Sequence, residues 1–249
     1  MRRGATGLII PVLILLLWEL FGRLGDLPVD AVSRPSDIAV AWFNSLIDGS
    51  LLLATWQTFE TALLGLAIAA TVGVLTGVAL GLMPLLEQVT GPTIEALRPI
   101  PAIAFMPLAL MMFGFGVALE ASIVAYACVW PILIVTIGAV RAIEPRLLEV
   151  AATLEMPLAD RLWKIVMPAA FARINVGLRI AAAIALVVAV TVEIVLNPRG
   201  LGYHLILAEQ SLHVGLMYAQ LFWLCVIGYL LNLVLRNIGG PSRAWGMAQ

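Results

Sequence analysis

Charged side chains inside long apolar runs are the first residues of this chain that could do chemistry. An ionised group at the centre of a bilayer costs about 2.5–3.5 kcal/mol on insertion scales, so such residues usually pair, face water or serve transport. Arg179 and Glu193 lie within one run, and 14 residues along a helix separate them by roughly 21 Å, so they cannot pair with each other. Three other carboxylates lie near the ends of runs, where they can reach the membrane surface: Glu19, Glu60 and Glu120.

The sequence lacks the motifs that would supply catalysis. It contains no G-x-x-x-x-G-K-S/T phosphate loop, no G-x-S-x-G elbow and no H-E-x-x-H helix. His204 and His213 have no neighbouring cysteine or cluster of carboxylates, which makes a metal site unfavourable. Cys128 and Cys225 fall inside apolar runs and are interpreted as buried packing residues. We therefore expect a chain that is not an enzyme, with no catalytic residue, no metal ligand and no cofactor of its own.

The composition is that of an integral membrane protein. Of the 249 residues, 62% are hydrophobic and only 12% are charged, and the mean hydropathy is +1.05. Six segments approach the roughly 20 residues that cross a bilayer, and none alternates as a barrel strand would. The fold class predicted is therefore an all-α membrane protein with six transmembrane helices. The segments are Gly4–Phe21, Thr61–Leu82, Ile94–Phe115, Ala118–Val140, Phe171–Leu196 and Leu216–Leu235.

The basic residues predict how these spans are oriented. Six spans place both termini on one side of the membrane, and that side then holds nine basic residues against three on the other. The positive-inside rule makes the richer side cytoplasmic. The nine are Arg2, Arg3, Arg141, Arg146, Arg161, Lys164, Arg173, Arg236 and Arg243, and the three are Arg23, Arg34 and Arg199.

Four regions follow from this topology. Residues 1–26 form the first transmembrane helix, interpreted as a retained span because no small-residue cleavage site follows it. Residues 27–58 form a periplasmic segment with an amphipathic helix that begins near Ser36 or Asp37, with Ser36 as its N-cap. Residues 59–240 form a five-helix core that includes the charged segment 141–170, and residues 241–249 form a cytoplasmic tail.

Two of the spans carry informative patterns of small residues and prolines. The second span has a small residue at every fourth position from Gly65 to Gly81, which predicts close packing against another helix. The third span contains Pro99, Pro101 and Pro107, which remove backbone donors. It is either a broken helix that lines a pathway, or a single helix that Arg98, Pro99 and Pro101 begin at the cytoplasmic interface, with one kink at Pro107.

The segment between the fourth and fifth spans combines charge with helical character. We expect a first helix from Pro145, a break at Pro157 and a second helix that ends at Pro168. Two short helices joined by a turn could insert into a cleft of a cytoplasmic protein.

This segment resembles the coupling motif of binding-protein-dependent ABC importer permeases, which reads E-A-A, three residues, G, nine residues and I-x-L-P. Glu149, Val150 and Ala151 occupy the E-A-A positions, Glu155 occupies the glycine position, and 165–168 read I-V-M-P. Glu155 must take a right-handed or extended conformation, or a left-handed one at a cost of about 1–2 kcal/mol. The runs R-P-I-P-A-I-A-F-M-P-L, G-L-R-I and G-L-G-Y are similar to the nitrate, sulfonate and taurine branch, although Glu60 replaces its frequent arginine.

The resemblance implies a type I ABC importer permease fold with cytoplasmic coupling helices in a bacterial inner membrane. Its expected partners are a second permease copy in a homodimer, two cytoplasmic ATPases that bind ATP and Mg, a periplasmic or lipid-anchored solute-binding protein and membrane lipids, with no nucleic acid. Contact with the ATPases would involve Glu149, Val150, Ala151, Ala152, Glu155, Pro157, Arg161, Lys164, Ile165 and Pro168. The translocation pathway would involve Arg98, Pro99, Pro101, Pro107, Arg179 and Glu193.

The substrate expected from this branch is a small anion such as a sulfonate, taurine or nitrate. A heterocycle resembling the pyrimidine precursor of thiamine is the alternative within the same class of importer. From another class, an ion-coupled secondary transporter could use Glu193 or Arg179 in its cycle. Such a transporter usually has interrupted helices in both halves, whereas only the third span is conspicuously interrupted here.

Overall fold

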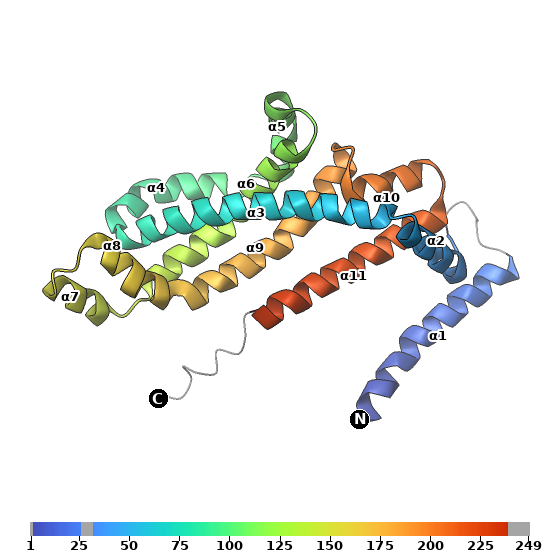
Figure 1. The fold of residues 1–249 in the computed structure, drawn as a ribbon, viewed down its shortest axis with the longest axis horizontal. Helices are drawn as coiled ribbons and strands as arrows, with labels where there is room; N and C mark the ends of the chain where they lie inside the picture. Colours follow the sequence, from blue (N-terminus) through green and yellow to red (C-terminus); the bar gives the residue numbers. More distant parts are fainter. Residues whose placement is uncertain (1, 26–31, 239–249) are drawn as a thin grey trace.

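The computed structural model describes residues 2–25 and 32–238, which are helical with no strand among them (Figure 1). This confirms the predicted all-α fold. The helices, in chain order, are α1 (Arg2–Leu24), α2 (Pro35–Ile47), α3 (Ser50–Leu82), α4 (Pro84–Leu97), the 3₁₀ helix η1 (Ala102–Phe105), α5 (Met106–Phe113), α6 (Val117–Arg141), α7 (Pro145–Thr153), α8 (Leu158–Arg161), the π-helical η2 (Leu162–Val166), α9 (Met167–Val195), α10 (Gly200–Gln210) and α11 (Val214–Ile238).

Four continuous helices in the described residues are long and apolar enough to cross a membrane. They are α3, α6, the helix formed by α8, η2 and α9 together, and α11. A fifth span could be formed by α4 with η1 and α5, which meet at 85°. The helix α1 covers the first predicted span over 23 residues but is not among these four. Four of the six predicted spans are therefore present as single helices, and the third is a bent pair.

The centre of the bundle is built from α3, α6 and α9, which lie side by side (Figure 1). The small-residue stripe of α3 faces α6 in a matching four-residue register. A Cβ added at Gly65 would lie 2.6 Å from the Cβ of Val124, and one added at Gly77 would lie 2.6 Å from the Cβ of Thr136. Only glycine permits this backbone approach, which confirms the predicted close helix packing.

The two cysteines differ in their surroundings. Cys128 is fully buried between the central helices, and its thiol donates to the carbonyl of Ala181 at 3.3 Å. Cys225, in contrast, lies exposed on α11. The prediction of a buried packing residue is therefore correct for Cys128 and wrong for Cys225, because Cys225 lines an open apolar groove between α1, α2 and α11.

The amphipathic helix begins one or two residues earlier than predicted. Arg34 is the N-cap of α2 and Pro35 is its first residue, where a fixed φ and a missing N–H suit the first helical turn. Ser36 is therefore not the N-cap. Its backbone N–H and its hydroxyl donate to the Glu19 carboxylate at 3.0 and 2.9 Å, which connects α1 to α2.

The prolines of the third span break it into two helices. Helix α4 ends at Leu97 with Arg98 as its C-cap, and Pro99 and Pro101 occupy the turn that leads to η1. The single-helix interpretation is therefore wrong, because the two helices meet at 85° and Pro99 and Pro101 lack the backbone N–H groups that a continuing helix needs. Pro107 is in the first turn of α5. Backbone N–H groups in the first turn have no partner within the helix, so the missing N–H of Pro107 costs no hydrogen bond and causes no kink.

Candidate functional site

The segment between α6 and α9 lies at one end of the long axis of the molecule, away from α10 (Figure 1). Leu148 of α7 and Leu162 of η2 pack on a buried cluster formed by the facing ends of α6 and α9. Ala151 of α7 is completely buried. The cluster comprises Ala139, Val140, Ile143, Val166, Ala170 and Ile174. Through these contacts the segment is attached to two of the three central helices.

The turn after α7 has the hydrogen bonds of a Schellman motif. The amide of Met156 donates to the carbonyl of Ala151, and the amide of Glu155 donates to that of Ala152, both at 3.0 Å. Glu155 occupies the position where such motifs usually have glycine, and its φ is +47°. Of the three conformations open to this residue, the structure has the left-handed one, at a cost of about 1–2 kcal/mol.

The helix that follows this turn does not end at Pro168. It runs without a break from Leu158 to Val195, through the π-helical turn Leu162–Val166. The prediction of a helix end at Pro168 is wrong for a physical reason. A proline clashes with the carbonyl four residues earlier in a regular α-helix, and the wider π turn immediately before Met167 changes that spacing. The second helix of the charged segment is therefore the first part of the fifth span.

The outer surface of this segment is both apolar and charged. Four large apolar side chains, which we call the coupling face, are 55–74% exposed: Val150, Leu154, Leu158 and Trp163. Lys164 pairs with Asp160 at 2.8 Å, whereas Glu149 has no ion pair among the described residues. Exposed apolar side chains with charged neighbours at the end of a membrane bundle are typical of a protein interface.

A buried polar network lies toward the opposite end of the bundle, where α3, α6 and the end of α9 meet. Glu120 is fully buried and accepts hydrogen bonds from the Thr61 hydroxyl and, at 2.7 Å, from the side-chain amide of Asn197. The carbonyl of the Asn197 side chain accepts from the amide of Gly116 at 3.0 Å. The prediction that Glu120 reaches the membrane surface is therefore wrong, because these two donors compensate its burial inside the protein.

Glu193 lies in the last turn of α9, next to the connection that leads to α10. Its side chain is buried, and one oxygen accepts the amide of Gly202 at 2.8 Å. Gly200 has a φ of +84°, and a Cβ there would overlap the Glu193 carboxylate. Both the backbone conformation and the lack of space therefore require glycine at this position. Thr58 accepts the amide of Leu201 at 2.9 Å from the α3 side. Glu193 thus connects the end of α9 to the first turn of α10.

The other charged candidates have separate partners. Glu60 pairs with Arg199 at 2.7 Å, and Glu19 pairs with Arg23 at 2.7 Å, both in partly exposed positions. Arg179 lies on α9 and donates to the backbone carbonyl of Arg236 on α11 at 3.3 Å. Arg179 and Glu193 do not pair with each other, as the sequence spacing predicts.

Sequence reasoning missed the polar partners of the two buried carboxylates. Thr58, Thr61 and Asn197 are unremarkable in the sequence, since each type also occurs on exposed helix faces. One available signal was the run N-P-R-G directly after an apolar span, because this composition is typical of a turn whose backbone needs partners. The remaining pathway candidates are all exposed: Arg98, Pro99 and Pro101 lie in the connection from α4 to η1, and Pro107 lies in the first turn of α5.

Comparison with known proteins provides independent evidence. Residues 69–239 match the family model described as "Binding-protein-dependent transport system inner membrane component". The chain is 29% identical over 244 residues to the bicarbonate transport system permease protein CmpB of Synechococcus elongatus, covering 93% of this chain and 88% of that protein. It is 26% identical to the taurine transport system permease protein TauC of Escherichia coli, covering 84% and 76%.

A solved structure supports the same architecture. An inward-facing structure of the MetNI methionine ABC transporter matches with a TM-score of 0.65. The match covers 76% of this chain and 94% of that chain at 18% identity, so it concerns the fold alone.

Proposed function

Because this chain belongs to the binding-protein-dependent transport system inner membrane components, we propose that it forms the membrane pathway of an ATP-driven importer for a small oxyanion. The chain has the role of a permease subunit, and energy comes from partner ATPases that bind ATP and Mg. A solute-binding protein delivers the substrate on the outer side. A second permease copy completes the pathway, and both termini face the cytoplasm.

The coupling face is the observation that carries this proposal. Its four exposed apolar side chains lie on α7, on the turn that follows it and on the next helix, and Ala151 and Leu148 attach α7 to the bundle. An ATPase that grips this face when it closes on ATP would pull directly on α6 and α9. Glu149, Arg161 and Lys164 are placed to add polar contacts around the apolar centre, as in the rim of an ordinary interface.

The substrate class rests on the relatives. Taurine and bicarbonate, named for two relatives, both carry a negatively charged oxygen group, and we extend this chemistry to the present chain. A cation on the pathway side of α9 suits such a solute, and Arg179 is the candidate. Arg98, the prolines of the α4–α5 connection and Glu193 stay proposed pathway residues.

The test of coupling is ATP hydrolysis by the permease co-purified with its ATPase. We compare wild type with Leu154→Asp, which places a charge at the centre of the coupling face, and with Glu149→Ala. Glu209→Ala, on the exposed surface of α10, is the matched control at the other end of the bundle. Leu154→Asp should abolish association, and Glu149→Ala should weaken it, while the control retains both association and hydrolysis.

Uptake measurements separate this function from an ion-coupled transporter. Uptake of an oxyanion should continue when the ion gradients are dissipated and should stop when ATP is removed. Two results together would overturn the proposal: uptake that depends on an ion gradient, and failure of both the wild type and the Glu209→Ala control to bind the ATPase.

A further inference from the structure

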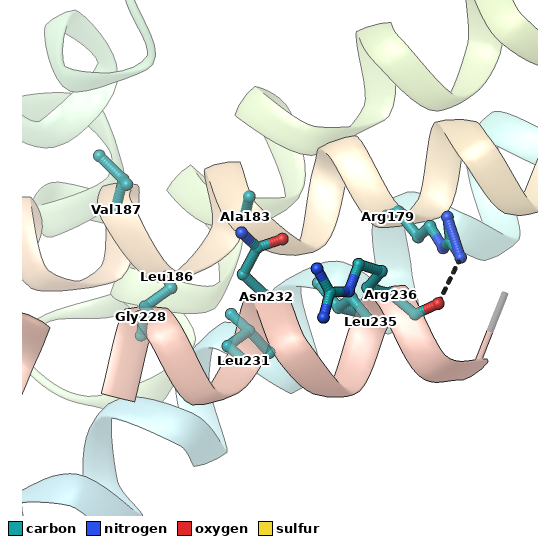
Figure 2. A pocket seen from close by; sticks show the side chains of 9 residues that line it. All are labelled: Arg179, Ala183, Leu186, Val187, Gly228, Leu231, Asn232, Leu235 and Arg236. Carbon is teal, nitrogen blue, oxygen red and sulfur yellow. Dashed lines mark hydrogen bonds between the residues drawn. The ribbon is translucent and has the colours of Figure 1, made fainter. Parts of the chain in front are cut away.

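An open groove lies between the middle of α9 and the C-terminal half of α11 (Figure 2). Its volume is about 480 Å³. Arg179 enters it from α9, and Asn232 and Arg236 enter it from α11, one helical turn apart. The remaining lining is mostly apolar, including Ala183 and Leu231.

The two arginines of this groove lack a counter-charge. Within residues 2–25 and 32–238, neither guanidinium forms an ion pair with a carboxylate. Residues 239–249, which continue from α11, contain no aspartate or glutamate side chain. Arg179 donates one hydrogen bond to the carbonyl of Arg236 at 3.3 Å, and its Nε is buried without a partner. A guanidinium has five N–H donors, so most of its capacity is unused.

Two like charges that share an apolar groove repel each other unless an anion lies between them. An oxyanion fits the available donors, because a guanidinium can form two parallel charge-assisted hydrogen bonds to one carboxylate, sulfonate or phosphate group. The side-chain amide of Asn232 adds a neutral donor beside them. The groove is also large enough for a small anionic group with part of its carbon chain.

We propose that the groove at Arg179, Asn232 and Arg236 binds one oxyanion. Two sources supply this chemistry: a free solute anion, or the headgroup of an anionic phospholipid in the adjacent leaflet. The solute source rests on the proposed transport function, whereas the headgroup source does not. In both cases the anion bridges α9 to α11, and this connection depends on charge.

The test uses the full chain in nanodiscs of purely zwitterionic phosphatidylcholine, titrated calorimetrically with methanesulfonate and with inorganic phosphate at constant ionic strength. Arg179→Gln and Arg236→Gln each remove one guanidinium and should weaken binding at least tenfold. Arg173→Gln is the matched control, because Arg173 is an exposed arginine on the same helix, outside the groove. It should bind as the wild type does.

A second arm tests the lipid. Nanodiscs that contain phosphatidylglycerol are analysed by native mass spectrometry, and retained lipid is compared among the same variants. Saturable binding of a free anion identifies a solute site, and selective retention of phosphatidylglycerol without free-anion binding identifies a headgroup site. Binding of either probe supports the proposal if Arg179→Gln and Arg236→Gln both lose it and Arg173→Gln retains it. Binding of neither probe, or equal loss in all three variants, overturns it.

Two features keep this test independent of folding and of transport. Arg236 is exposed, so Arg236→Gln should retain its melting temperature even if Arg179→Gln does not. Binding is measured without ATP or an ATPase, so its failure leaves the proposed importer function standing. Conversely, intact binding with no ATP-driven uptake would overturn the importer function alone.

Discussion

Replacing Glu155 with glycine should stabilise the turn after α7. Glu155 has a φ of +47°, which for a residue with a Cβ costs about 1–2 kcal/mol relative to right-handed backbone. Glycine avoids this cost, although it loses about 0.5–1 kcal/mol more conformational entropy than alanine when the turn forms. The net gain expected for Glu155→Gly is therefore about 0.5–1 kcal/mol.

This free energy corresponds to a two- to fivefold decrease in local opening, since about 1.4 kcal/mol is a factor of ten. Hydrogen exchange of the amides of Glu155 and Met156 reports this opening, because both amides are bonded to carbonyls of α7. Mass spectrometry of a peptide that spans residues 150–158, corrected for intrinsic exchange rates, measures the change in the purified protein.

Glu155→Ala is the matched control, since it removes the charge but keeps the Cβ. Its exchange rate should equal that of the wild type. If Glu155→Gly exchanges no more slowly than Glu155→Ala, the backbone strain assigned to this turn is absent and the reasoning is refuted. Slower exchange in both variants would instead assign the effect to the carboxylate.

Three further predictions concern packing, the buried network and the end of α10. Gly77→Ala should destabilise the protein by about 1–3 kcal/mol in thermal unfolding, because its Cβ would lie 2.6 Å from the Cβ of Thr136. Gly91→Ala is the control: its Cβ would meet no atom within 4 Å, so this variant should be neutral or slightly stabilising. Asn197→Ala should cost about 1–3 kcal/mol by leaving Glu120 with one fewer donor, and an unchanged melting temperature would contradict the network. Leu212 has a φ of +55°, so Leu212→Gly should slow amide exchange at the end of α10; faster or equal exchange would argue against strain there.

Local patterns made much of this fold predictable. The stripe from Gly65 to Gly81 repeats every four residues, which places all its members on one helix face, and that face packs on α6. The spacing from Glu149 to Pro168 likewise resembles the coupling motif, because a motif fixes the positions of residues along one short stretch of chain, and the coupling role of these residues stays a prediction. Membership of the permease family follows from such patterns and is supported by the matched family model.

Contacts between distant segments could not be predicted in this way. The sequence suggests that Glu120 is a residue at a span end, yet Thr61 and Asn197 bury it through hydrogen bonds across 59 and 77 residues of chain. The end of the second coupling helix was mispredicted because proline usually ends helices, and no local rule announces a π-helical turn before Pro168. The choice between a broken helix and a single kinked helix for the third span likewise depends on whether other parts of the fold pack against the turn at Pro99.

The continuous helix from Leu158 to Val195 connects the two ends of the molecule, so a tilt of this helix at one end displaces the other. Its 38 residues extend for roughly 57 Å, from the coupling face to the turn that Glu193 contacts. A tilt of about 5° around one end would move the other end by about 5 Å, which exceeds the length of any hydrogen bond in the buried network. A small rotation at the end that carries the coupling face is thus enough to displace the other end of the helix by more than a hydrogen-bond length.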